Sequence, residues 1–230
     1  MTDYLEPYRR AVDEMGPGFE ALLWRSRDFQ QVRFRVLIET AAAGLAPFEA
    51  KPIASALKNR VIVDLGCGRA DMLAWLDEHR VPFGRYMGVE AIPELVNATA
   101  ARTMNRDDAE VIEADFAGDD DLFPSLVRSH SAEVLLFSGS LNTFEQPAAL
   151  VVVERAFEAM RNQPAGAVVF NFLSSLMPNA PADDTGPAHR FDTHAVTAFA
   201  AALTNAYTVR HDYLRGHDAT VGIFTQPPRR

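Results

Sequence analysis

Cysteine is nearly absent from this sequence of 230 residues. The single cysteine, Cys67, can form no intramolecular disulfide and cannot build a zinc site that needs several cysteines. No run of eighteen apolar residues occurs, so we predict no membrane span. Residues 1–6 are acidic and lack an apolar core, so we expect no signal peptide. These absences favour a cytoplasmic protein with no membrane partner and no metal.

Basic residues are also in the minority. The chain has 22 Lys and Arg against 31 Asp and Glu, which gives a formal net charge of −9. Because phosphate contacts need Lys and Arg, this charge argues against a nucleic acid partner. The densest basic stretch contains Arg25, Arg27, Arg33 and Arg35. We interpret it either as a solvated helix face or as a binding patch.

The order of apolar segments indicates an α/β fold. Residues 1–50 have apolar side chains at helical spacing and are expected to form an N-terminal helical cap. Residues 51–230 are expected to form one compact unit, in which alternating strands and helices predict a mostly parallel sheet covered on both faces. Seven strands are expected, at 61–65, 86–90, 110–116, 132–138, 167–173, 207–214 and 219–225. Helices are expected at 70–79, 93–105, 147–162 and 192–205.

The last two expected strands differ from the others. Only residues 215–218 separate them, a gap too short for a crossover helix, so they must pair as an antiparallel hairpin. Ligands of open parallel sheets bind beyond the carboxyl ends of the strands. The residues just after each strand are therefore the candidates for a site.

A glycine loop with acidic neighbours follows the first expected strand. Gly66 and Gly68 allow a sharp turn and a close approach of backbone to a ligand. A dinucleotide-binding loop would have Gly or Ala three residues after Gly68, where Asp71 would repel a pyrophosphate but suit an ammonium group. Asp64 precedes the loop, and Glu90 ends the second strand, where a carboxylate can accept hydrogen bonds from ribose hydroxyls.

The third expected strand adds Asp115 and Phe116 near its end. A carboxylate can receive the amino group of adenine, and an aromatic ring can cover the base. The ligand described by the whole set has a ribose, an adenine and a cationic amino acid, and it has no phosphate. S-adenosylmethionine fits this description and NAD does not.

The run from Val61 to Gly68 resembles motif I of the class I S-adenosylmethionine-dependent methyltransferases, which have a Rossmann-like domain. The resemblance covers residues 60–226, including the terminal hairpin, and departs from motif I where Ala70 replaces the third glycine. It implies that Gly66 and Gly68 approach the methionine part of the cofactor. It implies further contacts from Glu90 to the ribose, from Asp115 and Phe116 to the adenine, and from backbone at Ser138 or Gly139 to the amino acid end, with Cys67 and Ala91 beside them.

The class of methyl acceptor is predicted from a sequence motif that this chain lacks. Residues 138–144 lack the Asn/Asp-Pro-Pro-aromatic pattern of enzymes that methylate planar amino nitrogens, which together with the acidic charge favours a small-molecule O or N acceptor. Asn142 is interpreted as an acceptor contact or as a turn former. The alternatives are a protein or RNA methyltransferase that docks through Arg25–Arg35, and a non-catalytic module that binds S-adenosylmethionine.

In-line methyl transfer needs mainly alignment, which can supply roughly 7–11 kcal/mol of barrier reduction. A general base is needed only for an acceptor that carries a proton. His189 and Tyr213 are the first candidates, ahead of His194, His211 and His217. His211 and Tyr213 are expected on one face of their strand.

The N-terminal cap is expected to close over the site. Trp24 is a candidate substrate contact, Phe34 packs nearby, and Arg33 is our candidate for the carboxylate of S-adenosylmethionine. The long loop 174–189 is interpreted as a lid or as a disordered segment. We expect a monomer or a homodimer.

Overall fold

A single mixed sheet organises the chain in the computed structural model, which describes residues 3–46, 49–180 and 186–225. The strand order is β3-β2-β1-β4-β5-β8-β7, and the two-residue β6 also pairs with β5. Strands β1 to β6 run parallel to one another, whereas β8 is antiparallel to both β5 and β7. The strands are β1 Val61–Leu65, β2 Arg85–Glu90, β3 Ala109–Glu113, β4 Val134–Phe137, β5 Ala167–Ser174, β6 Arg190–Phe191, β7 Tyr207–Arg210 and β8 Asp218–Phe224.

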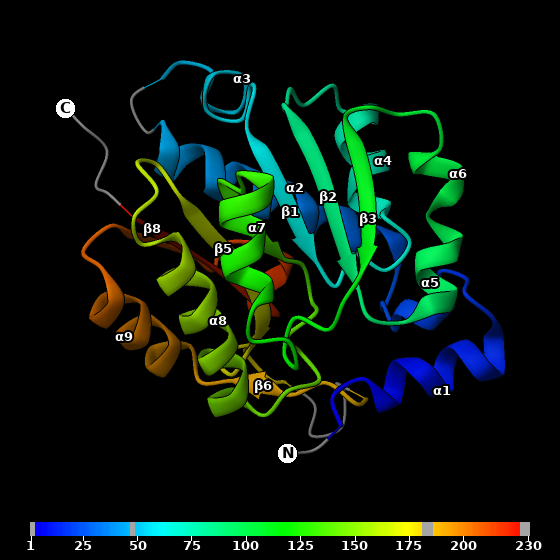
Figure 1. Cartoon of the computed structure of the whole chain (residues 1–230). Helices are drawn as coiled ribbons and strands as arrows, with labels where there is room; N and C mark the ends of the chain where they lie inside the picture. Colours follow the sequence, from blue (N-terminus) through cyan, green and yellow to red (C-terminus); the bar gives the residue numbers. More distant parts are fainter. Residues whose placement is uncertain (1–2, 47–48, 181–185, 226–230) are drawn as a thin grey trace.

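The predicted fold class is confirmed: the sheet is mostly parallel, ends in an antiparallel pair and has helices on both faces (Figure 1). Helices α7, α8 and α9 cover one face, and α2 and α4 cover the other. No described helix is long and apolar enough to cross a bilayer. The helices are α1 Glu6–Met15, α2 Arg27–Leu45, α3 Pro52–Ala56, α4 Asp71–Glu78, α5 Pro93–Ala98, α6 Ala100–Thr103, α7 Leu122–His130, α8 Gln146–Met160 and α9 Thr193–Leu203, with short 3₁₀ turns η1 Glu20–Leu22 and η2 Leu214–Gly216.

Several segments differ from the sequence-based expectation: α3, α7 and β6 were not expected, and β3 ends at Glu113. The helix expected at 93–105 is divided at Thr99, whose hydroxyl donates to the Val96 carbonyl at 2.7 Å and so competes with the helical ladder. The strand expected at 207–214 ends at Arg210, because left-handed residues at 214 and 215 turn the chain into η2. His211 and Tyr213 therefore do not share a strand face, and that expectation was wrong.

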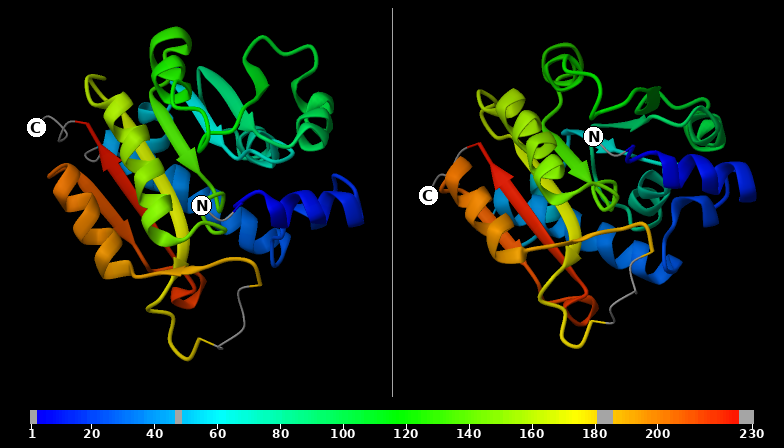
Figure 2. Two further views of the ribbon diagram at one scale, coloured as in Figure 1. Left: turned by 60° about the horizontal axis from the view of Figure 1, so that its bottom comes forward. Right: turned by 90° about the horizontal axis from the view of Figure 1, so that it is seen from below.

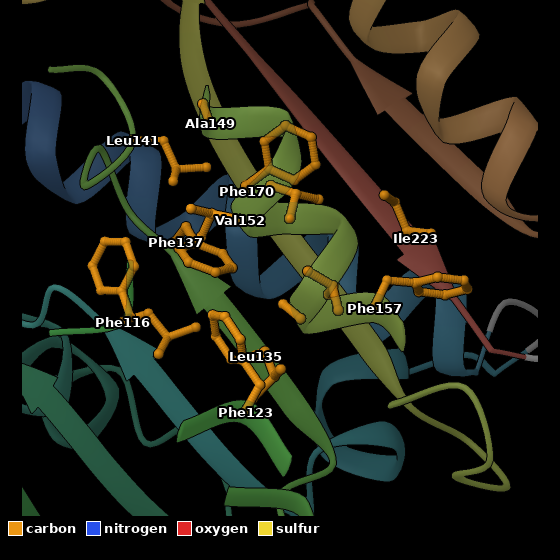
Figure 3. Close-up of a cluster of buried hydrophobic side chains, with 14 of the residues drawn as sticks. Phe116, Phe123, Leu135, Phe137, Leu141, Ala149, Val152, Phe157, Phe170 and Ile223 are labelled. Atoms are coloured by element: carbon orange, nitrogen blue, oxygen red, sulfur yellow. The ribbon is translucent and has the colours of Figure 1, made fainter. Parts of the chain in front are cut away.

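Alternation of side chains along the central strands produces a core on each side of the sheet. On β4, Leu135 and Phe137 point toward α8, whereas Val134 and Leu136 belong to the cluster beneath α2 and α4. Aromatic rings and aliphatic side chains from α7, α8 and the strands fill the first of these cores (Figure 3). This two-sided burial explains why the central strands are continuous apolar runs.

Residues 1–50, expected as a cap, divide into two structural roles. Helix α2 packs against β5 and β8 and is one layer of the fold. Helix α1 lies instead below the carboxyl ends of β2 and β3 (Figure 1; Figure 2, right). Its Ala11 and Val12 pack with Ile92, in the β2–α5 connection, and with Leu95 on α5. The segment before α2 therefore covers the strand ends, whereas α2 is mainly a layer of the fold.

Phe170 on β5 tests this packing. Its side chain is fully buried between the sheet and α8, so Phe170→Ala is expected to lower the free energy of unfolding by about 3–5 kcal/mol. Urea denaturation followed by far-UV circular dichroism measures the change. The control Val151→Ala removes an exposed side chain from α8 and is expected to stay within about 0.5 kcal/mol of the parent. Equal stability of the two variants would contradict the assigned core.

Candidate functional site

The glycine loop joins β1 to α4 and is folded against β2. The N–H groups of Gly66 and Cys67 donate to the Val89 carbonyl at 2.8 and 3.0 Å. Gly66 has a φ of +75°, and a Cβ there would lie 2.4 Å from Ser140 Cβ, so the position requires glycine. Ala70 stands where the resembled motif has its third glycine and keeps the left-handed φ of 54°, at a cost of about 1–2 kcal/mol.

Glu90 fastens this loop to the end of β2. Its Oε2 accepts a hydrogen bond from the Gly68 N–H at 2.8 Å, and its Oε1 accepts from Ala91 and Ile92 at 2.9 and 3.0 Å. Burial raises the pKa of Glu90, and the three backbone donors oppose that rise. The carboxylate therefore fixes two loops whose backbones meet at the strand ends.

Asp64 brings a second buried carboxylate to the same place. Tyr86 donates its hydroxyl to Oδ2 at 2.7 Å, while Oδ1 has no hydrogen-bond partner among the described residues. Burial, together with the nearby charges of Glu90 and Asp71, raises the pKa of Asp64 to about 7 against the lowering effect of the Tyr86 hydrogen bond. A buried carboxylate oxygen without a hydrogen-bond partner is suited to a cationic ligand.

The turn after β4 forms the next wall. The Gly139 N–H donates to Oδ1 of Asn171 at 2.8 Å, and Asn142 N–H donates to the Gly139 carbonyl at 3.1 Å. A Cβ on Gly139 would lie 2.9 Å from the Trp24 ring, so the indole packs directly on this glycine. The Ser138 hydroxyl and the Asn142 side-chain oxygen are buried and have no partner in the described part of the chain.

These loops enclose one cavity with most of the predicted residues in its wall. From the expected cofactor set it contains Arg33, Asp64, Gly66, Cys67, Gly68, Glu90, Ala91, Phe116, Ser138 and Gly139, and from the expected substrate set Trp24 and Asn142. The predicted residues Asp71, Asp115, His189 and Tyr213 do not line it. The cavity lies at the carboxyl ends of β1, β2 and β4, where open sheets bind ligands.

Asp71 is paired within the protein instead of facing the cavity. Its Oδ1 lies 2.6 Å from Arg102 Nη2, and its Oδ2 accepts from Gln30 Nε2 at 3.3 Å. The interpretation of Asp71 as a partner for a ligand ammonium is therefore not supported by its position, because a nearby arginine already neutralises the carboxylate. Asp64, unlike Asp71, lines the cavity.

Asp115 is also engaged internally. Its Oδ1 accepts hydrogen bonds from the N–H groups of Ala117 and Gly118 at 2.9 and 3.1 Å, and from the Tyr4 hydroxyl. The neighbouring Phe116 does reach the cavity wall. Tyr4 thus lies between Asp115 and the cavity.

Arg33 reaches the cavity from α2 but is held by the other end of the chain. Its Nε and Nη2 donate to the Asp218 carboxylate, and its guanidinium lies 4.7 Å from the centre of the Trp24 ring. His217 Nδ1 lies 2.5 Å from Asp218 Oδ1. Although burial opposes it, Arg33 and His217 lower the pKa of Asp218. Burial of Arg33 also removes it from the basic stretch that begins at Arg25, so the four arginines do not form one surface patch.

The structure places no predicted base in the cavity. The Tyr213 hydroxyl is buried against Thr220 Oγ1 at 2.6 Å, and burial raises the pKa of this phenol. His189 is half-exposed, with Nε2 3.7 Å from Glu145 Oε1. His211 Nε2 lies 3.1 Å from the Gly216 carbonyl oxygen. His217 is buried on Asp218, and His194 is exposed on α9.

Sequence reasoning missed the N-terminal residues that complete the cavity wall. Tyr4, just before α1, and Tyr8, in its first turn, both line it, as do Ser140 and Thr143 after β4. Tyr4 precedes the helix, so helical spacing does not relate the two tyrosines. Pro187 and Ala188 from the predicted lid also line the cavity, whereas residues 181–185 of that loop lie outside the described residues.

No protein-family model and no curated protein sequence matches this chain. An O-methyltransferase family protein from Burkholderia thailandensis is 16% identical over 96% of this chain and 63% of its own, with a TM-score of 0.61. Magnesium protoporphyrin IX methyltransferase from Synechocystis PCC 6803, solved with bound SAH, is 9% identical over 98% of this chain and 95% of its own, with a TM-score of 0.56. A small RNA methyltransferase gives a TM-score of 0.55 at 14% identity, over 84% of this chain and 25% of its own.

The fold is that of the class I methyltransferases. The present chain spans less than two thirds of the Burkholderia protein. Because one fold supports many activities, the activity of this class I methyltransferase fold must be argued from its site.

Glu90 provides a test of the site's construction in the absence of ligand. Glu90→Ala leaves the Gly68, Ala91 and Ile92 N–H groups without their acceptor, so it is expected to lower the free energy of unfolding by at least about 2 kcal/mol. Glu90→Gln keeps one acceptor oxygen and is expected to cost less. Urea denaturation of the two variants and the parent measures both changes. An alanine variant as stable as the parent would show that the glycine loop keeps its conformation without the Glu90 carboxylate.

Proposed function

We propose that the protein is an S-adenosylmethionine-dependent methyltransferase. The observation that carries the proposal is the buried Asp64 Oδ1, an acceptor without a partner among the described residues, in a cavity beside the glycine loop. Two further buried acceptors without partners, on Ser138 and Asn142, belong to the same wall. A buried carboxylate needs a counter-charge, and the cationic amino acid of S-adenosylmethionine supplies one.

The rest of the wall suits the other parts of the cofactor. The loop at Gly66–Gly68, with Cys67 between the glycines, would hold the methionine part by its backbone. Glu90 has acceptor capacity beyond its N–H partners for ribose hydroxyls, and Ala91 and Phe116 would contact the base. Asp218 takes two of the five N–H donors of Arg33, so the guanidinium keeps donors for the carboxylate of the cofactor.

Bound S-adenosylmethionine supplies an activated methyl group on a sulfonium. The protein's part is to place the acceptor atom in line with that methyl and to exclude water, as the enclosed wall from Tyr8 to Trp24 would do. Burial raises the pKa of the Tyr8 phenol to about 12, so Tyr8 keeps its proton at neutral pH and can donate a hydrogen bond. His189 and Tyr213 lie outside the cavity, so the mechanism that we propose uses neither as a base.

We propose a small-molecule O or N acceptor, bound beside Asn142 and Trp24. The support is the closure of the cavity by the segment before α2, which leaves less access for a folded macromolecule, and the net charge of −9. The Burkholderia and Synechocystis neighbours are named an O-methyltransferase family protein and a porphyrin methyltransferase. A protein or RNA acceptor, or binding without turnover, would appear in the assays below as different outcomes.

The first test is binding. S-adenosylhomocysteine is expected to bind the purified protein with low-micromolar Kd at one site per chain, because it keeps the ammonium, ribose and adenine that the cavity fits. Isothermal titration calorimetry measures this, with NAD as the control expected not to bind. Turnover with S-adenosylmethionine and a metabolite extract would then support a small-molecule acceptor, and turnover only with the macromolecular fraction would contradict it. Absence of binding by folded protein would end the proposal.

The second test is the pH dependence of that binding. The free protein holds Asp64 with a pKa of about 7, and a bound ammonium would lower it, so binding releases a proton below that pH. Affinity is therefore expected to fall by up to about tenfold per pH unit as the pH drops below about 7. Calorimetry between pH 5.5 and 8 measures the profile.

Two variants assign that profile to Asp64. Asp64→Asn is expected to bind S-adenosylhomocysteine more weakly and without this pH dependence. Tyr86→Phe removes the hydroxyl that holds the pKa of Asp64 down, so the fall in affinity is expected to begin at higher pH. An unchanged profile in the asparagine variant would assign the titration to another group.

A further inference from the structure

Tyr4 lies at the end of the cavity that we assign to the base. Its ring stacks on Phe144 with the ring centres 4.0 Å apart and lies 5.7 Å from Phe116 in a tilted contact. The residue is buried, and it lines the cavity together with Phe116. A planar ring therefore already occupies the aromatic end of the site.

The Tyr4 hydroxyl completes the coordination of Asp115. The Oδ1 of Asp115 accepts two local N–H groups, from Ala117 and Gly118, and the phenol is its third donor. Three donors therefore already converge on this one oxygen, which is more than its two lone-pair directions accommodate in ideal geometry. Asp115 accordingly does not line the cavity. An adenine amino group could reach this oxygen only by replacing the phenol.

The segment that carries Tyr4 has contacts of its own besides those of the tyrosine side chain. Thr143 Oγ1 donates to the Tyr4 carbonyl at 2.9 Å, and Leu5 packs into the main core. Asp3 pairs with Arg9 on the exposed side of α1 at 2.5 Å. Helix α1 is anchored separately, because Ala11 and Val12 pack with Ile92 and Leu95 in a cluster that does not include Tyr4.

We infer that Tyr4 is an internal competitor for the adenine subsite, which its ring and hydroxyl fill until the nucleoside displaces them. The Tyr4 side chain supplies a planar ring to the aromatic contacts and a hydrogen-bond donor to Asp115. Adenine, with its amino group, has the same two properties. This inference rests on the proposed function. According to this inference, Tyr4 and the adenine base cannot occupy the subsite at the same time.

Tyr4→Phe is the discriminating variant, since it keeps the ring and removes only the hydroxyl. Losing a hydrogen bond to a carboxylate is expected to lower the Tm of the free protein by about 3 °C. The same change is expected to tighten S-adenosylhomocysteine binding by about tenfold. If the role of Tyr4 were purely structural, the substitution would lower both stability and affinity. A lower Tm combined with tighter binding therefore indicates competition for the adenine subsite.

Calorimetry and thermal unfolding of parent, Tyr4→Phe and the control Tyr207→Phe supply the measurements. Tyr207 is exposed on β7, and its variant is expected to match the parent in both. Adenosine alone should show the same gain with Tyr4→Phe, because the competition concerns the base. Binding by the parent with no gain in Tyr4→Phe would overturn this inference and leave the proposed function standing. No binding by any of the three proteins would overturn both.

Discussion

The site is built around one carboxylate and three backbone N–H groups. Glu90 connects the glycine loop after β1 with the start of the next loop after β2, and both loops carry backbone into the cavity. Without that acceptor, neighbouring polar backbone would be buried without partners. The strand register brings the two loops together, because β1 and β2 are parallel neighbours from Val61 and Arg85 onward. The shape of the cavity thus depends on a group that also lines it.

Much of this arrangement could be predicted from the sequence, because the signals are local. An apolar run followed by glycines predicts a strand and its loop, and parallel neighbours put Glu90 beside Gly68. The side-chain partners could not be predicted in the same way. Tyr4 and Asp115 are 111 residues apart, and Arg33 and Asp218 are 185 apart. Such pairs depend on how distant segments pack on the sheet, and no short sequence pattern predicts that packing.

Arg33 illustrates the limit most clearly. The sequence shows an arginine in a basic, aromatic segment, which suggested a ligand for a carboxylate. The structure shows that the protein supplies a carboxylate of its own, Asp218, and that His217 and Trp24 complete the surroundings. A buried ion pair is costly to break by removing one partner. Arg33 therefore has a structural role that is present before any ligand, and the ligand role that we propose would be added to it.

Helix α2 packs on β5 and on β8, the last strand of the described chain, and Arg33 reaches the first residue of that strand. During synthesis the ribosome makes α2 well before β8, one of the surfaces that α2 covers. Contacts of such long sequence separation form slowly, since a long loop must close before they are made. The nascent chain therefore carries an apolar helix face without its full partner until β8 has been made. This wall of the cavity assembles only when the final strand enters the sheet between β5 and β7.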